Sequence, residues 1–589
     1  SEPREQVIAT WADRAARLPR TEAEEVVAEV ERLTGIKPRK LAGALNEARA
    51  SAAKEQARRA FEKKRAGRVE IEVEKGEVGS MSRAAERAIV ARGVPGAYLN
   101  FAGTPVCVRV DQLPNTHLID DGDASAPPVP QFKPFNDPLM RVTVEGAVIF
   151  VGYDVKGRPR REDVPPPVVA QMLQNPSDSV PKVSGLLAHP VVLPDGTLLA
   201  KDGLHERTGL YLHGARVDGL RPYTRAEAAE AVARLREGLF REFEFASALD
   251  ALVALAGLFT AMHRRLMPSS PGLAVLASRQ SSGKTTLARV IHLATTGHDM
   301  PVTTLSESTE ELKKHLFALL LRSPEMVCVD NIADGYTFRS PALAAMMTTD
   351  VYCDRVLGQS ENRQVRTNTF WVITGNNLSL GADEITRWMV CRLEPSMARP
   401  EERRFKHADV AQMVSRLRPQ ILRDVVGVVW GYLKSDQGAA PSSGSRYPVW
   451  DRLVRLPLIW AGAGDVAEVF AKNRESSPDE IAKAGLLSAL YDLSDGAVFR
   501  AIDVKDWLQG SFAGDGVAVL PGGKHEAVRR LRAALAESRV KNADAPSTSS
   551  IGRVLNGSAG ACVETERGPL RLARRGTKEA TAWQVELRG

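Results

Sequence analysis

The stretch Ala274–Val290, AVLASRQSSGKTTLARV, decides the fold of the central part of this 589-residue chain. An apolar run leads into a glycine-containing turn, and a helix-forming segment follows. This order matches the phosphate-binding loop G-x-x-x-x-G-K-[ST], whose backbone amides and lysine surround phosphate groups. Gly283, Lys284 and Thr285 fit the motif, whereas Ser278 occupies the first glycine position. That glycine mainly serves the turn, so we expect little loss of nucleotide binding.

The loop predicts an ATP site with Mg²⁺ as the metal ion. Its predicted nucleotide contacts are Ser281, Ser282, Gly283, Lys284, Thr285 and Thr286. A P-loop ATPase also holds Mg²⁺ through an acid at the end of a second strand. The segment PEMVCVDNI supplies Asp330 after four apolar residues. Thr285 and Asp330 are therefore the predicted metal ligands.

The group that activates the attacking water is left open by the sequence. Many such ATPases carry a glutamate after the strand-end aspartate, but this chain has Asn331. Glu310 and Glu311 are candidates, although Glu311 also fits a capping box with Ser308. Glu325 begins the same strand, about 15 Å away at about 3.3 Å per residue, so we discount it. Alternatively, Asn331 only orients the water, as an amide does in some GTPases.

Two polar residues follow the third apolar strand, TFWVITGNN. Asn376 ends this strand, where its side chain can reach between the γ-phosphate and the acid of the second strand. Arg387 lies in DEITRWMVCRLEP, and no acidic partner is obvious at its spacing. We interpret it as an arginine finger that completes a neighbouring subunit's site, with a surface salt bridge as the alternative.

Apolar runs that alternate with helical patterns predict an α/β fold for this region. Changes in composition on either side predict further domains. The expected order is a helical segment and connector over 1–66, a β-rich domain over 67–222, an ATPase domain with helical lead-in and lid over 223–433, a linker over 434–447, and a C-terminal helical and winged-helix-like domain over 448–589.

The C-terminal domain ends in two helices and a hairpin, which together indicate a winged helix. Its first helix places Val528, Leu531 and Leu535 on one face. The hairpin tip is basic, which predicts contact with DNA phosphates; a protein-docking module is the alternative. The predicted DNA contacts of the tip are Arg574, Arg575 and Lys578.

Composition sets further bounds. The chain has 79 Lys and Arg against 72 Asp and Glu, and a net charge of +7 is compatible with a polyanionic partner. The longest apolar run, Ala251–Met262, is too short to span a bilayer and predicts a buried helix, so no membrane partner is expected. The five cysteines lack C-x-x-C spacing, which fits a reducing cytoplasm. Asp121 and Asp123 form a D-x-D in a Gly/Pro-rich loop, a poor metal site.

Taken in order, five features resemble the superfamily 3-type AAA+ helicases of the phage and prophage primase–helicase group: the P-loop, the strand ending in Asp330 and Asn331, DRVLG, TGNN, and D-x-x-x-R ending at Arg387. Flanking segments such as WDRLVRLPLIWAG agree. The resemblance implies an AAA+ core and a homo-oligomeric ring, a hexamer by expectation, in a bacterial host's cytoplasm. It also implies translocation on single-stranded DNA and separation of forked DNA in phage or mobile-element replication. Asn331 and Trp388 depart from the family pattern.

In this family a hairpin between the second and third strands projects into the pore. The resemblance places it at 354–368, DRVLGQSENRQVRTN, and the DNA contacts it implies are Arg355, Arg363 and Arg366. No primase centre is visible, so we expect a primase partner or a primase domain on a preceding segment.

Two other functions stay open. One is an AAA+ replication initiator or loader, favoured by Asn331 and the wing. The other is a nucleotide-stabilised clamp with slow hydrolysis. A packaging terminase is disfavoured, because no acidic nuclease cluster follows the ATPase region.

Overall fold

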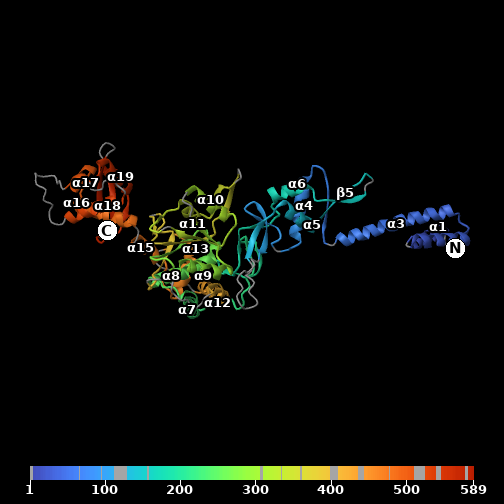
Figure 1. Ribbon diagram of the computed structural model, residues 1–589, viewed down its shortest axis with the longest axis horizontal. Helices are drawn as coiled ribbons and strands as arrows, with labels where there is room; N and C mark the ends of the chain where they lie inside the picture. The colour runs from blue at the N-terminus through green and yellow to red at the C-terminus, as the bar shows by residue number, and fades with distance from the viewer. Residues whose placement is uncertain are drawn as a thin grey trace. The chain divides into compact units, whose positions relative to one another are not determined.

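The computed structural model describes most of the chain (Figure 1). The described residues are 4–16, 18–65, 67–94, 96–111, 129–155, 158–304, 309–332, 334–357, 361–381, 383–397, 409–435, 444–475, 478–509, 524–538, 545–576 and 581–588. They belong to two compact units: Ser1–Cys107 with Lys133–Pro181, and Val108–Phe132 with Lys182–Gly589. No helix among the described residues has the length and apolar character needed to cross a membrane.

The first unit begins with three helices. They are α1 (Arg4–Ala15), α2 (Arg20–Thr34) and α3 (Pro38–Arg65). Ala15, Ala23 and Leu45 are buried between them. These helices occupy most of the segment for which the sequence predicts helix.

The remainder of the first unit is a mixed α/β structure. Its strands are β1 (Val69–Glu72), β2 (Leu99–Phe101), β3 (Thr104–Asp111), β4 (Val129–Pro134), β5 (Val148–Tyr153) and β6 (Pro159–Glu162), with β3 and β4 running across the unit boundary. Its helices are α4 (Val78–Ala91), α5 (Asp137–Ala147) and α6 (Pro166–Gln174). β1 pairs with β5 in parallel, and β5 pairs with β6 antiparallel. Met140, Val144, Val168 and Met172 are fully buried in its core.

The prediction of a β-rich domain over 67–222 left out three helices, α4, α5 and α6, that lie among the strands of the first unit. The error is clearest at α5, whose apolar residues alternate with polar ones as they do in a strand. Asn136 determines the outcome, because its side chain accepts a 3.0 Å hydrogen bond from the backbone N–H of Leu139. An Asn in this position caps a helix, and Pro138 in the first turn is compatible with it.

Short hairpins, as expected, do form in the segment that opens the second unit. The strands are β7 (Lys182–Val183), β8 (Gly185–Leu187), β9 (Val191–Val192), β10 (Leu198–Leu199), β11 (Gly203–His205) and β12 (Leu210–Leu212). β11 pairs antiparallel with β12, and β12 pairs in parallel with β8. Leu187, Val191 and Leu212 are fully buried beneath them.

A five-stranded parallel sheet forms the centre of the second unit. Its strands, in spatial order, are β14 (Val302–Thr304), β15 (Met326–Ile332), β19 (Phe370–Asn376), β13 (Gly272–Ala277) and β21 (Trp388–Leu393). The helices of this region are α7 (Arg225–Leu235), α8 (Ala248–His263), α9 (Lys284–Thr296), α10 (Thr309–Leu320), α11 (Pro341–Thr348) and α12 (Val410–Lys434). Every residue of β13 is buried, which explains its continuous apolar run. Because all five strands are parallel, their carboxyl ends lie along one edge of the sheet.

Smaller elements surround this sheet. Strands β17 (Val351–Arg355) and β18 (Asn362–Arg366) form an antiparallel hairpin, and β16 (Thr337–Phe338) pairs with β20 (Ser379–Leu380). The helices α13 (Pro448–Trp450), α14 (Leu456–Trp460) and α15 (Glu468–Glu475) follow α12 in the chain.

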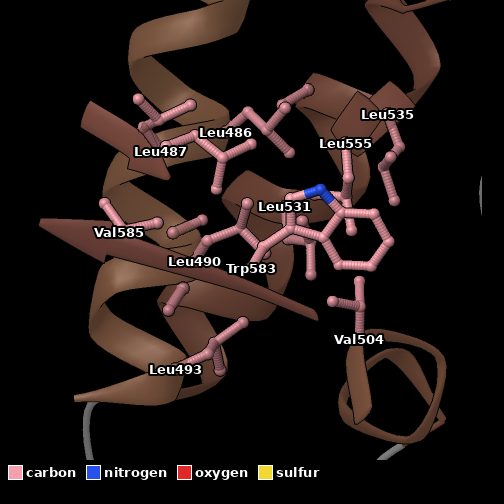
Figure 2. Close-up of a cluster of buried hydrophobic side chains, with 14 of the residues drawn as sticks. Leu486, Leu487, Leu490, Leu493, Val504, Leu531, Leu535, Leu555, Trp583 and Val585 are labelled. Atoms are coloured by element: carbon pink, nitrogen blue, oxygen red, sulfur yellow. The ribbon is translucent and has the colours of Figure 1, made fainter. Parts of the chain in front are cut away.

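The C-terminal lobe has a core of its own. Its elements are α16 (Pro478–Ser494), α17 (Ala501–Leu508), α18 (Lys524–Glu537), α19 (Thr548–Ser558), β22 (Cys562–Val563), β23 (Leu570–Gly576) and β24 (Thr581–Leu587). Figure 2 shows the ring of Trp583 among leucines that include Leu490, Leu531 and Leu555. The helical face predicted from Val528, Leu531 and Leu535 is buried in this core.

Candidate active site

The P-loop lies between β13 and α9, at the carboxyl edge of the sheet. Its left-handed backbone positions are Ser281, with φ of 56°, and Gly283, with φ of 87°. Glycine suits the second position because a side chain there is strained. Ser278 is not among the positive-φ residues. The loop can therefore form with serine in the first motif position.

Lys284 begins α9 and directs its ammonium group into the loop. Nζ donates hydrogen bonds to Oδ1 of Asn376 at 2.6 Å, Oγ of Ser282 at 3.1 Å and the carbonyl oxygen of Arg279 at 3.2 Å. Burial lowers the pKa of Lys284, and the nearby charge of Asp330 opposes this effect. All three hydrogen-bond acceptors are neutral oxygens, so the cation fits a site for the phosphates of a nucleotide.

Thr285 and Asp330, the predicted metal ligands, are in direct contact. Oγ1 of Thr285 donates a 2.9 Å hydrogen bond to Oδ1 of Asp330, although β13–α9 and β15 lie far apart in the sequence. Mg²⁺ prefers oxygen ligands, and beside nucleotide phosphates a hydroxyl and a carboxylate oxygen that lie next to each other can bind it. The donor set therefore fits a magnesium ion.

Thr374 is a site residue that the sequence reasoning missed. From β19, its hydroxyl donates to Oδ1 of Asp330 and accepts a 3.2 Å hydrogen bond from the backbone N–H of Asn331. Thr374 thus orients the acid and fixes the backbone after it. Its only signal in the sequence is a polar residue within an apolar strand.

Asn331 has a structural reason for its place beside Asp330. Its φ is 59°, and the pairing of β15 with β19 shifts between Val329 and Ile332. Asparagine tolerates this left-handed conformation far better than most residues with a side chain do. The backbone geometry alone therefore accounts for an Asn where a glutamate was expected.

The acids considered for water activation occupy different environments. Glu325 is buried at the start of β15, with Oε2 3.3 Å from Nε2 of His189. Its position agrees with our reason for discounting it. Glu311 is exposed in the first turn of α10, where Oε1 accepts a 2.7 Å hydrogen bond from Nζ of Lys314. Ser308, its expected capping partner, lies outside the described residues.

Asp334 is a further acid at the carboxyl edge of the sheet. Its Oδ1 accepts a 2.9 Å hydrogen bond from Nδ2 of Asn377. The backbone N–H of Asn377 in turn donates to the carbonyl oxygen of Ala277, the last residue before the P-loop, at 3.1 Å. Asp334 is thereby held near the nucleotide loop. The sequence reasoning missed it because it lies four residues after Asp330, beyond the end of β15.

A cavity of about 640 Å³ opens beside the P-loop. Thr286 and Val290 of α9 line one part, Phe243 another, and Met413 and Leu417 of α12 a third. Charged residues, among them Arg241 and Arg416, complete the lining, and a cavity of this size with both apolar and polar walls is typical of a small-molecule site. Its position beside Thr286 suits the base and ribose of a nucleotide.

Arg387 lies at the opposite edge of the sheet from the P-loop. Its carbonyl oxygen accepts a 2.9 Å hydrogen bond from the backbone N–H of Gly272, the first residue of β13. The P-loop follows the last residue of that strand, about 17 Å away at about 3.3 Å per residue. Arg387 forms no ion pair within the described part of the chain, and its Nε is buried without a hydrogen-bond partner there. Both observations disfavour the surface salt bridge and a role in its own subunit's site.

The expected hairpin is present, with corrected bounds and a corrected distribution of arginines. It runs over Val351–Arg366 rather than 354–368. Arg355 pairs with Asn362 near the turn, whereas Arg366 pairs with Val351 at the base. Both guanidinium contacts of Arg366 go to Asp350, at 2.7 and 2.9 Å. The three arginines therefore do not form one cluster at the tip.

The hairpin packs against α10. Nζ of Lys313 lies 3.1 Å from Oδ2 of Asp354, and the rings of Phe317 and Tyr352 are 6.1 Å apart. Arg363 contributes a 3.1 Å contact from Nε to Oε1 of Glu361. The Lys313–Asp354 and Phe317–Tyr352 contacts join the hairpin to a helix that follows β14, the strand beside Asp330.

The C-terminal hairpin separates the arginines predicted to act together. Arg574 pairs with Trp583 and Arg575 with Ala582, so their side chains point to opposite faces. Arg575 donates to Oε1 of Gln584 at 3.1 Å and also contacts Glu586. Lys578 lies outside the described residues. The two described arginines, Arg574 and Arg575, therefore do not form one basic surface.

Comparisons with known proteins give only distant matches. No family model matches the sequence, and no curated protein matches it. Among solved structures, the chain is similar to the apo C-terminal region of NrS-1 at 12% identity and a TM-score of 0.32, covering 76% of this chain and 100% of that chain. It is also similar to a JCV helicase with a bound small molecule at 14% identity and a TM-score of 0.19, covering 43% and 74%. Scores this low do not establish a shared fold, so the function is argued from the site itself.

Proposed function

We propose that this chain is an ATP hydrolase of the superfamily 3 type, a ring-shaped helicase that moves on single-stranded DNA. One observation carries the proposal. Four polar residues meet at one edge of the sheet through hydrogen bonds of 2.6 and 2.9 Å. Lys284 and Thr285 begin the helix that follows β13, whereas Asp330 lies in β15 and Asn376 ends β19. Lys284 would neutralise the phosphates of ATP, and the adjacent cavity would receive its base.

Mg²⁺ would be held by Thr285 and Asp330 and would supply charge neutralisation at the β- and γ-phosphates. Thr374 would keep the Asp330 carboxylate oriented. Asn376 would contact the γ-phosphate from the side of Asp330, opposite Lys284, and would sense whether that phosphate is present. The water would be activated by Glu311, oriented by Asn331, or activated by Asp334.

The position of Arg387 supports an oligomer. Because it is about 17 Å from its own P-loop along β13, an arginine finger at this position would serve a neighbouring subunit. A head-to-tail contact repeated around an axis closes into a ring. A hexamer is the expected size, in the cytoplasm of a bacterial host, with a primase as a possible partner in phage or mobile-element replication.

The hairpin supports a DNA-moving function. Its contacts with α10 give a path from the strands around Asp330 to Arg355 and Arg363. Arginines that face a single strand bind its phosphates. Nucleotide hydrolysis would then move the hairpin together with the bound strand.

A replication initiator or loader is the second candidate function, and a nucleotide-stabilised clamp with slow hydrolysis is the other. Asn331 favours them, since it offers no carboxylate directly after Asp330. The C-terminal lobe also favours an initiator, because β22 pairs with the β23–β24 hairpin and Phe499 bridges to Trp583 on its other side, as in a winged helix.

The decisive experiment measures strand separation on forked DNA with ATP and Mg²⁺. We expect wild type to unwind and to show turnover stimulated by single-stranded DNA, and Lys284→Ala to do neither. ATP turnover without strand separation would instead support the initiator or loader. Lys284→Ala with wild-type turnover would exclude the P-loop as the hydrolysis site. Lys75→Ala, which replaces an exposed lysine between β1 and α4, is the control.

A further inference from the structure

A second cavity, of about 380 Å³, lies away from the nucleotide loop in the same unit. Three arginines line it: Arg207 from the segment after β11, Arg265 after α8, and Arg366 at the end of β18. Ser184 and Thr208 add hydroxyl groups, and Asp195 adds a carboxylate. Cavities of this volume are large enough for a nucleotide-sized ligand.

Arg265 is the buried member of this group. Its exposed fraction is 7%, and its guanidinium donates to Oδ1 of Asn368 at 2.6 Å and to the carbonyl oxygen of Ser323. Its Nε has no hydrogen-bond partner within the described residues. Burial lowers the pKa of Arg265 to about 10, and the charge of Glu325 opposes this. Both hydrogen-bond acceptors of Arg265 are neutral oxygens, so Glu325 compensates its charge only through longer-range attraction, and an anion in the cavity would stabilise it further.

The two other arginines are paired. Arg207 lies 2.7 Å from Asp195, and Arg366 lies 2.7 Å from Asp350. Asp195 and Asp350 thus pair with the two other arginines, whereas Arg265 has neutral hydrogen-bond acceptors and only the longer-range attraction of Glu325. Hydroxyl groups beside a positive cavity are the usual surroundings of a bound phosphate.

Arg366 connects this cavity with the hairpin. It ends β18 and lines the cavity, so the cavity lies at the base of the hairpin, whereas Arg355 and Arg363 lie nearer its turn. We propose that the cavity binds a backbone phosphate of single-stranded DNA through Arg207, Arg265 and Arg366. The choice of DNA as the ligand rests on the proposed function, because free phosphate would make the same contacts with these arginines.

The test uses surface residues, because Arg265 also holds the chain between β18 and β19 in place. A fluorescent oligothymidylate is titrated with the full chain at several salt concentrations, with Arg207→Glu and Asp195→Asn as variants. Arg221→Glu and Glu227→Gln are matched controls, since Arg221 and Glu227 form an exposed pair at 2.6 Å and do not line the cavity. We expect Arg207→Glu to weaken binding about tenfold, the effect of one charged hydrogen bond. Its slope of log affinity against log salt should fall by about 0.7.

Asp195→Asn should act in the opposite direction and tighten binding, because it removes a negative charge from the cavity while leaving the arginines. If both variants behave like their controls while wild type binds the oligonucleotide, the cavity is no DNA site, and the proposed function stands without it.

Inorganic phosphate is titrated separately by calorimetry. Oligonucleotide binding that depends on Arg207, with no measurable phosphate binding, supports the inference. Phosphate binding that depends on Arg207 in a chain that does not bind oligonucleotide overturns both DNA as the ligand and the helicase proposal.

Discussion

The ammonium group of Lys284 and the amide oxygen of Asn376 are 2.6 Å apart, although 92 residues separate them in the chain. The parallel pairing of β13 with β19 produces this contact, because it places Ala277 opposite Asn376. The P-loop lysine and the end of the third strand thus act on the same point in space. A γ-phosphate would have to enter between them.

Asn376→Ala should lower kcat for ATP by about 10- to 100-fold, the value of a hydrogen bond to a charged group. KM should change less, because Lys284 and the loop amides still bind the phosphates. Phosphate release under saturating ATP measures the effect. Asn556→Ala, which removes an exposed amide on α19, is the control; an equal loss of kcat in both variants would contradict a role for Asn376.

The water-activating group is tested by three carboxylates in parallel. We expect Glu311→Gln to lower kcat more than Glu325→Gln, because Glu325 is buried beside His189 at the far end of β15. Glu325→Gln should mainly lower the free energy of unfolding. If Asp334→Asn lowers kcat more than Glu311→Gln does, Asp334 is the acid that activates the water. Similar small effects on kcat from all three variants would leave Asn331 as the group that orients the water.

The two described arginines of the C-terminal hairpin should not be equivalent. Arg575 is held by Gln584 and Glu586, whereas Arg574 points to the opposite face. We expect Arg574→Glu to weaken duplex binding and to reduce its salt slope by about 0.9 or more, and Arg575→Glu to have a smaller effect. Arg529→Glu is the matched control, because Arg529 forms an exposed pair with Glu526 on α18. Salt slopes unchanged from wild type in both hairpin variants would indicate a docking module.

These outcomes show what local sequence can and cannot predict. The P-loop and the buried strands were predictable, because an apolar run followed by Gly-Lys-Thr is a local pattern. Thr374 and Asp334 were not, because their roles depend on which strand lies beside β15. The opposite faces of Arg574 and Arg575 follow from strand alternation only once the bounds of β23 are known. At α5, one capping residue, Asn136, outweighed an alternating pattern that indicates a strand.

Acid should destabilise the second unit through two buried histidines. Burial lowers the pKa of His263 to about 4 and that of His292 to about 3, from an ordinary value of 6.5. Between pH 6.5 and these values the unfolded chain binds protons that the folded chain does not, so the free energy of unfolding falls as the pH falls. The loss across the full window should be about 3 kcal/mol for His263 and about 5 kcal/mol for His292.

Urea unfolding followed by tryptophan fluorescence between pH 7 and pH 4.5 measures this dependence. His263→Leu should make the decline with pH shallower, because one titrating group is gone. His525→Leu, which replaces an exposed histidine on α18, should leave the decline as in wild type. A decline that is the same in all three proteins would show that other groups cause it.

Arg387 gives the sharpest test of a shared active site, because it lies about 17 Å along β13 from its own P-loop. Arg387→Ala and Lys284→Ala should each abolish ATP turnover when assembled alone. When the two inactive variants are mixed in equal amounts, some sites should combine the intact Lys284 of one subunit with the intact Arg387 of its neighbour. Random mixing in a head-to-tail ring predicts recovery of about a quarter of wild-type turnover. A double variant carrying both substitutions should rescue neither single variant, which controls for nonspecific stabilisation. If the mixture of single variants stays inactive although mixed rings form, Arg387 acts within its own subunit or only in its fold, and the argument from Arg387 for a ring is lost.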